Sequence, residues 1–152
     1  MSAIATSLQA VRDRIAKAAR DFGRSPGEIS LLAVSKTWPV DCVIEASRAR
    51  QRLFGENYVQ EGVAKVLATA GLGLEWHFIG PLQSNKTRLV AEHFSWVHSI
   101  ERLKVAERLS AQRPDELPPL SVCIEVNVSG AATKNGCAPD EALALCQAVS
   151  AL

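Results

Sequence analysis

The chain has little net charge, no long apolar run and no pair of closely spaced cysteines. Its 17 basic and 16 acidic residues give a formal net charge of +1, which is not the electrostatic footprint of a nucleic-acid-binding protein. No apolar run is long enough to span a bilayer, and no signal-peptide core opens the chain. The composition therefore predicts a protein that binds neither nucleic acid nor membrane.

The four cysteines form no Cys-x-x-Cys pair, which argues against structural zinc and a disulfide framework. Three of them stand in apolar surroundings, where a small buried thiol is the usual outcome. We therefore expect a reduced, cytoplasmic protein without a metal site. The cysteines are Cys42, Cys123, Cys137 and Cys146.

Apolar runs alternate with helix-like segments after an opening amphipathic helix over residues 1–20. This alternation is typical of a parallel sheet with right-handed crossovers. Five units fit a complete doubly wound sheet, or the first part of a (β/α)₈ barrel, which needs about 250 residues. The chain stops inside an apolar helix pattern, which favours the incomplete barrel. Strands are expected at 29–35, 52–57, 75–79, 96–100 and 121–128, with helices at 40–50, 60–70, 85–93, 101–112 and after 139.

Helix boundaries and faces can also be predicted. Asp41 is expected to cap the helix over 40–50 or to favour its positive end, and Ser84 to cap the helix over 85–93. In the helix over 40–50, the side chains expected to face inward are Val43, Ile44 and Ala46, and the helix over 60–70 carries the apolar residues Val63, Val66 and Leu67.

The apolar run over 29–35 ends in one lysine, Lys36, and Pro39 then turns the chain. Ligands of α/β folds bind at the carboxyl ends of the strands. Apolar walls there would partly desolvate the amine, lower its pKa and favour attack on aldehydes. The alternative is a strand-end lysine that reaches into solvent.

Every predicted strand delivers polar groups at or just past its carboxyl end. In a parallel sheet these ends share one edge, so the groups would surround one apolar mouth suited to a small polar aldehyde or a cofactor ring. The alternative is that strand-to-loop transitions are simply polar. The groups are Lys36, Glu56 with Asn57, the loop over 80–86, His98 with Ser99, and Asn127 with Ser129.

Several segments, in order, closely resemble the pyridoxal 5′-phosphate (PLP) homeostasis protein family of the YggS and PROSC type, and the third is long and specific. The resemblance covers nearly the whole chain. The segments are AVSKT at 33–37, FGENYVQE at 54–61, WHFIGPLQSNK at 76–86, VHSI at 97–100, EVNVS at 125–129 and KNG at 134–136.

The resemblance implies a TIM-type barrel like the N-terminal domain of alanine racemase, here one incomplete domain over residues 1–152. It implies that Lys36 carries PLP as a Schiff base and that Asn57 lies beside the cofactor. His77, Ser99 and Asn127 are implied near the same mouth. The implied role is to hold, buffer or deliver the cofactor, and so influence amino-acid metabolism, without established catalysis. PLP-dependent apoenzymes are the implied partners, and full-length relatives are expected to be monomeric.

Two departures from the family pattern matter. Gly130, Ala131 and Ala132 stand where the loop after the fifth strand usually carries an acidic residue. The family also continues for about three more strand–helix units, which carry the backbone cup for the phosphate and an arginine near the ring nitrogen. A phosphate normally needs such donors, so we expect the Lys36 chemistry to survive while affinity is largely lost. The open strand edges predict self-association.

Three alternatives stay open from the sequence. A PLP-dependent racemase or decarboxylase would need an acid or base facing the cofactor ring, and Tyr58 is the only tyrosine. A Schiff-base aldolase on the same barrel would act without PLP. A degenerate fragment would bind nothing.

Overall fold

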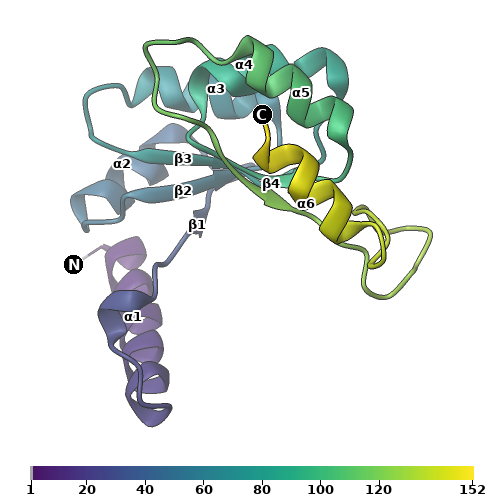
Figure 1. The fold of residues 1–152 in the computed structure, drawn as a ribbon. Coiled ribbons are helices and arrows are strands. Elements are labelled where there is room, and N and C mark those ends of the chain that lie inside the picture. Colours follow the sequence, from purple (N-terminus) through teal and green to yellow (C-terminus); the bar gives the residue numbers. More distant parts are fainter. Residues whose placement is uncertain (1) are drawn as a thin grey trace.

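A computed structural model describes residues 2–152. Five parallel strands form one sheet, in the spatial order β1-β2-β3-β4-β5 that they follow in the chain (Figure 1). The strands are β1 (Ala33–Val34), β2 (Leu53–Glu56), β3 (Glu75–Phe78), β4 (Trp96–Ile100) and β5 (Ser121–Ile124). The helices are α1 (Ala3–Asp21), α2 (Val40–Arg48), α3 (Val59–Ala68), α4 (Thr87–His93), α5 (Leu103–Gln112) and α6 (Ala142–Ser150), with short 3₁₀ helices η1 (Pro26–Glu28) and η2 (Ser84–Lys86).

The core lies between the sheet and the helices that connect its strands. Phe54, Phe78 and Val97 point from the strands into this layer, where they meet apolar residues of α2 to α5. Because side chains alternate along a strand, the neighbouring residues face the opposite side of the sheet. That side is partly open: Val34 is 49% exposed, and Cys123 is also exposed. The sheet therefore has one helix-covered face and one open face.

The predicted alternation of strands and helices is confirmed, but β1 is much shorter than the strand predicted over residues 29–35. Only Ala33 and Val34 pair with β2. The carbonyl of Leu31 instead accepts a hydrogen bond from Nε2 of the buried Gln51 (2.7 Å). The segment before β1 is thus held by a side chain rather than by a strand ladder.

The fifth strand is also shorter than predicted. β5 ends at Ile124, and the chain beyond it forms an isolated bridge between Val126 and Cys137. The expectation of three buried cysteines is wrong, because only Cys137 is buried. Cys42 is partly exposed, Cys123 lies on the open face of the sheet, and Cys146 lies on an exposed side of α6.

One of the two predicted helix starts is confirmed and the other is wrong. Asp41 lies in the first turn of α2, whose N-cap is Pro39, so it favours the positive helix end, the second of its two predicted roles. Ser84 opens η2 rather than capping α4. Leu67 of α3 is exposed, whereas Lys65 is buried. No helix among residues 2–152 combines the length and apolar character needed to cross a membrane.

A prediction concerns Gly62, where α3 comes close to its neighbours. A Cβ there would lie 2.7 Å from Cζ of Phe94 and 3.2 Å from Cβ of Glu56, both buried. Alanine normally stabilises a helix relative to glycine by about 1 kcal/mol, but overpacking costs about 1–3 kcal/mol. We expect Gly62→Ala to lower the free energy of unfolding by about 1 kcal/mol in urea denaturation.

The exposed Ala64 of the same helix supplies the control. Ala64→Gly removes only helix propensity and should cost about 1 kcal/mol. A Gly62→Ala variant more stable than the parent chain would contradict the close packing described for α3.

Candidate functional site

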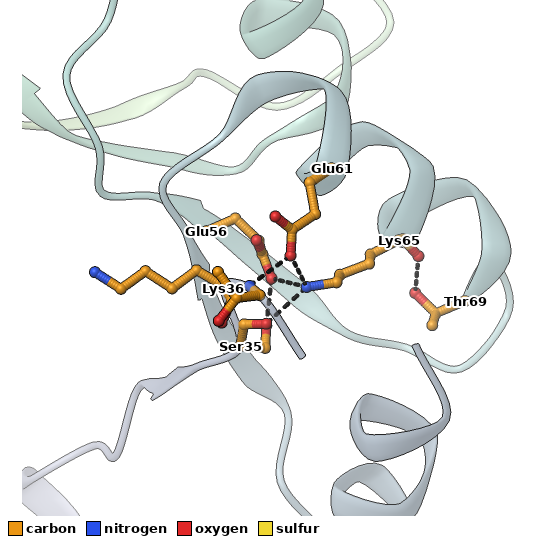
Figure 2. Close-up of polar contacts among 7 residues, drawn as sticks. Ser35, Lys36, Glu56, Glu61, Lys65 and Thr69 are labelled. Carbon is orange, nitrogen blue, oxygen red and sulfur yellow. Dashed lines mark hydrogen bonds and ion pairs between the residues drawn. The ribbon is translucent and has the colours of Figure 1, made fainter. Parts of the chain in front are cut away.

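Lys36 stands two residues after the end of β1, at the carboxyl end of the sheet. Val34 pairs with Gly55, and Lys36 and Asn57 each follow two residues further on, past the ends of these adjacent strands. The Lys36 side chain is exposed, and Figure 2 shows it extending away from its neighbours. The desolvation expected from the sequence is therefore not found, because no described element covers this end of the open face.

A buried polar network lies behind Lys36, on the helix-covered side (Figure 2). At its centre, Lys65 Nζ donates to the carbonyl oxygen of Ser35 (2.6 Å), Glu56 Oε1 (2.7 Å) and Glu61 Oε1 (2.7 Å). Ser35 Oγ also donates to Glu56 Oε1 (2.6 Å), and the Thr37 N–H donates to Glu61 Oε1 (2.7 Å). The residues on both sides of Lys36 are thus bound to one buried ammonium and its two carboxylates.

Burial makes this network unusual. Glu56 is 0% exposed and Lys65 5% exposed, and charged residues are rarely buried unless they are paired. The hydrogen bond from Lys65 lowers the pKa of Glu61, as does the Thr37 N–H, against an opposing effect of burial. Glu56 Oε2 is buried without a hydrogen-bond partner among the described residues. One charged oxygen of Glu56 is therefore fully satisfied and the other is not.

Asn57 and Gly80 meet at the ends of β2 and β3. Asn57 Oδ1 is buried and has no hydrogen-bond partner within residues 2–152. A Cβ on Gly80 would overlap the carbonyl oxygen of Asn57 and lie 2.7 Å from its Cα, so only glycine allows this approach. Ser99, from β4, donates its Oγ proton to the carbonyl oxygen of Gly80 (2.6 Å) and holds the contact in place.

His77 lies deeper in the sheet than Lys36. It pairs with Gly55, one level below Asn57, about 7 Å along the strand. Its Nε2 contacts Glu75 Oε1 (2.9 Å), its Nδ1 contacts His98 Nε2 (2.9 Å), and its ring stacks on Trp96 at 5.5 Å between centroids. Both ring nitrogens of His77 are therefore already engaged.

Asn127 organises the loop after β5. Its Nδ2 donates to the carbonyl oxygens of Ala131 (3.0 Å) and Lys134 (3.3 Å), and its Oδ1 accepts from the Gly130 N–H (3.0 Å). The loop that departs from the family pattern is thus closed by its own asparagine.

Lys36 follows β1 and Asn57 follows the adjacent β2, whereas His77 lies on β3, Ser99 on β4 and Asn127 beyond the end of β5. Within residues 2–152, none of these five side chains hydrogen-bonds to another. The cofactor roles of all five stay predictions.

Sequence reasoning gave no role to the three residues that join Glu56 in fixing the Lys36 turn: Ser35, Glu61 and Lys65. One signal was available, because Lys65 follows Glu61 by four residues and stands among apolar residues of its helix. The site thus has a primary amine on a fixed turn, which can condense with a compound carrying a carbonyl group, and an unpartnered amide oxygen at the end of the adjacent strand.

Comparison with known proteins places this geometry in a family. Residues 6–152 match the family described as "Alanine racemase, N-terminal domain". The chain therefore belongs to the alanine racemase N-terminal domain family, and the predicted barrel-type fold is confirmed.

The relatives of this chain confirm the resemblance seen in the sequence. It is 58% identical to the pyridoxal phosphate homeostasis protein of Pseudomonas aeruginosa, over 100% of this chain and 66% of that protein. It is 60% identical over 139 residues to the protein of the same name in Escherichia coli, over 90% of this chain and 59% of that one. The chain thus spans about two thirds or less of the length of these relatives.

Solved structures give the same result. PipY of Synechococcus elongatus PCC7942, without PLP, superposes with a TM-score of 0.84 at 36% identity, over 98% of this chain and 65% of PipY. The structure of PipY with PLP bound superposes with a TM-score of 0.78 at 35% identity, over 97% and 64%.

The histidine pair predicts a pH dependence of stability. Burial lowers the pKa values of His77 and His98 below their ordinary value of 6.5. At His77 the hydrogen bond to Glu75 opposes this lowering of the pKa. At His98 the neighbouring His77 lowers the pKa further. As the pH falls, the unfolded chain takes up protons first. The free energy of unfolding should be fully retained above about pH 6.5 and decline as the pH falls toward the lowered pKa values.

Urea denaturation at about pH 7.5 and about pH 5.5 measures this decline. His98→Gln removes one titrating ring and should make the decline shallower than in the parent chain. An equal decline in the parent chain and in His98→Gln would contradict the assignment.

Proposed function

We propose that this chain is the lysine-bearing part of a barrel that holds pyridoxal 5′-phosphate as a Schiff base on Lys36. The observation that carries the proposal is the position of Lys36 at the carboxyl end of a parallel sheet, where hydrogen bonds from Lys65 and to Glu61 fix its two flanking residues. The names of the relatives and the PLP-bound PipY structure support it.

The residues present fit the reactive end of the group. Pyridoxal 5′-phosphate carries an aldehyde that condenses with a primary amine and releases water. Lys36 Nζ supplies the amine, free of any contact with the buried network (Figure 2). Asn57 Oδ1, buried and without a partner among the described residues, offers an acceptor at the end of the adjacent strand, where Gly80 packs directly against the Asn57 backbone.

We propose a role in cofactor and amino-acid homeostasis rather than catalysis. The relatives are named homeostasis proteins. Racemisation needs an acid or base placed against the bound cofactor, and the one tyrosine, Tyr58, is 56% exposed at the start of α3. Release of the cofactor to PLP-dependent apoenzymes, in the cytoplasm, is the step we propose for the whole protein.

We further propose that residues 1–152 act as one PLP-binding unit formed by the first part of the barrel. The relatives are longer than this chain, and the family resemblance assigns the phosphate cup to their later segments. Lys36 and Asn57 therefore supply the covalent attachment and one polar contact, and tight binding of the phosphate depends on other segments.

The test is covalent labelling of the purified chain. With added pyridoxal phosphate, the parent chain should show a visible absorbance band, and borohydride reduction with peptide mapping should place the label on Lys36. Lys36→Arg keeps the positive charge but removes the reactive primary amine, so the band and the label at this position should disappear.

Lys104→Arg is the matched control, because Lys104 is an exposed lysine of α5, away from the Lys36 turn. This variant should keep the band. Random labelling of surface lysines in the parent chain, with a band unaffected by Lys36→Arg, would overturn the proposed function.

A further inference from the structure

Lys36 lies in a tight turn closed by a backbone hydrogen bond. The N–H of Trp38 donates to the carbonyl oxygen of Ser35 (3.1 Å), so Lys36 and Thr37 are the two central residues of the turn. The conformation of this turn therefore sets the direction of the Lys36 side chain.

The turn is strained at Thr37. Its φ is +65°, in the left-handed region that glycine tolerates and that β-branched residues avoid. The second central residue of a type II turn has a positive φ, and glycine is normal there. A strained residue of this kind persists only where its surroundings determine its conformation.

The surroundings that hold the turn converge on Lys65. Its ammonium binds the Ser35 carbonyl directly, and it also holds Glu61 Oε1, the oxygen that accepts the Thr37 N–H. All three donors of the ammonium are used, the third on Glu56. Both ends of the strained dipeptide are thereby tied to a single buried charge.

Stability alone does not account for a buried lysine here. A buried ion pair is often no more stabilising than apolar residues of similar volume, because both charges must be taken out of water. In this pair, Glu56 Oε2 also lacks a partner. The charges instead fix the positions of particular groups. An ammonium can bind a carbonyl oxygen and two carboxylate oxygens at fixed positions, which an apolar side chain cannot do.

We propose that Lys65 is a positioning residue for Lys36: through Ser35 and Glu61 it locks the strained turn and so aims the Lys36 amine at its carbonyl ligand. The inference rests on the proposed function of Lys36 for its ligand, but the locking of the turn is a property of the free protein. Lys65 is not itself attached to the ligand, because its ammonium is buried and fully used.

The first measurement needs no cofactor. Lys65→Met combined with Glu56→Gln removes both buried charges at nearly constant volume, so the variant keeps its core while losing the direct bond to the Ser35 carbonyl. We expect the Thr37 amide hydrogen to exchange about tenfold faster in this double variant than in the parent chain, by NMR hydrogen exchange.

A matched variant separates positioning from a general loss of stability. Thr87→Val removes a fully buried hydroxyl that bonds to Gln112 (2.7 Å) in the layer between α4 and α5. It should lower stability without changing the exchange of the Thr37 amide relative to the amides of the core. Equal protection of Thr37 in the double variant and the parent chain would overturn the inference.

The second measurement uses pyridoxal phosphate as the probe. Borohydride trapping after short exposures gives the labelling rate of Lys36 relative to the exposed Lys104. This ratio should fall about tenfold in the Lys65→Met, Glu56→Gln variant and stay unchanged in Thr87→Val. Lys65→Arg, which retains the charge, should recover part of the loss.

The two proposals fail in different ways. If the parent chain is not labelled at Lys36, the proposed function is wrong, and with it the aiming role. If the parent chain is labelled at Lys36 but the ratio is the same in the double variant, Lys36 binds the cofactor without help from Lys65, and only this inference is overturned.

Discussion

The buried contact between Lys65 and Glu56 is the constraint on which the site depends. It joins α3 to β2, and through the Ser35 carbonyl it fixes the end of β1, which has only two paired residues of its own. A strand this short cannot define the position of its last residue by ladder hydrogen bonds alone. The Ser35 N–H also donates to the Gly55 carbonyl oxygen (3.0 Å), so strand pairing and the buried Lys65 charge both hold the start of the turn that carries Lys36.

The two faces of the sheet carry different parts of the structure. The helix-covered face holds the apolar core and the Lys65 network, whereas the open face carries Lys36, Asn57 and the histidine pair. Side chains alternate between the two faces along each strand, so a residue that faces the ligand lies between neighbours that face the core. Ser35 and Glu56 are such neighbours, and here they are polar and bonded to each other (2.6 Å).

The parts of the fold that were predicted from the sequence depend on local patterns. The alternation of strands and helices, and the placing of Lys36 and Asn57 at strand ends, follow from apolar periodicity and chain order. The burial of Lys65 was not predicted, because it depends on the rotation of α3 and on partners 9 and 30 residues away. The length of β1 was missed for a similar reason, since it depends on pairing with β2.

The most direct test of this account is a double-mutant cycle between Glu56 and Lys65, read as the free energy of unfolding in urea. If the two charges and the Ser35 carbonyl form one unit, Lys65→Met leaves the buried Glu56 carboxylate without its counter-ion, and Glu56→Gln leaves Lys65 with Glu61 as its remaining carboxylate. The second change should then relieve part of the cost of the first, with a coupling free energy of about 2 kcal/mol or more between the two positions. Effects that add to within about 0.5 kcal/mol would contradict it.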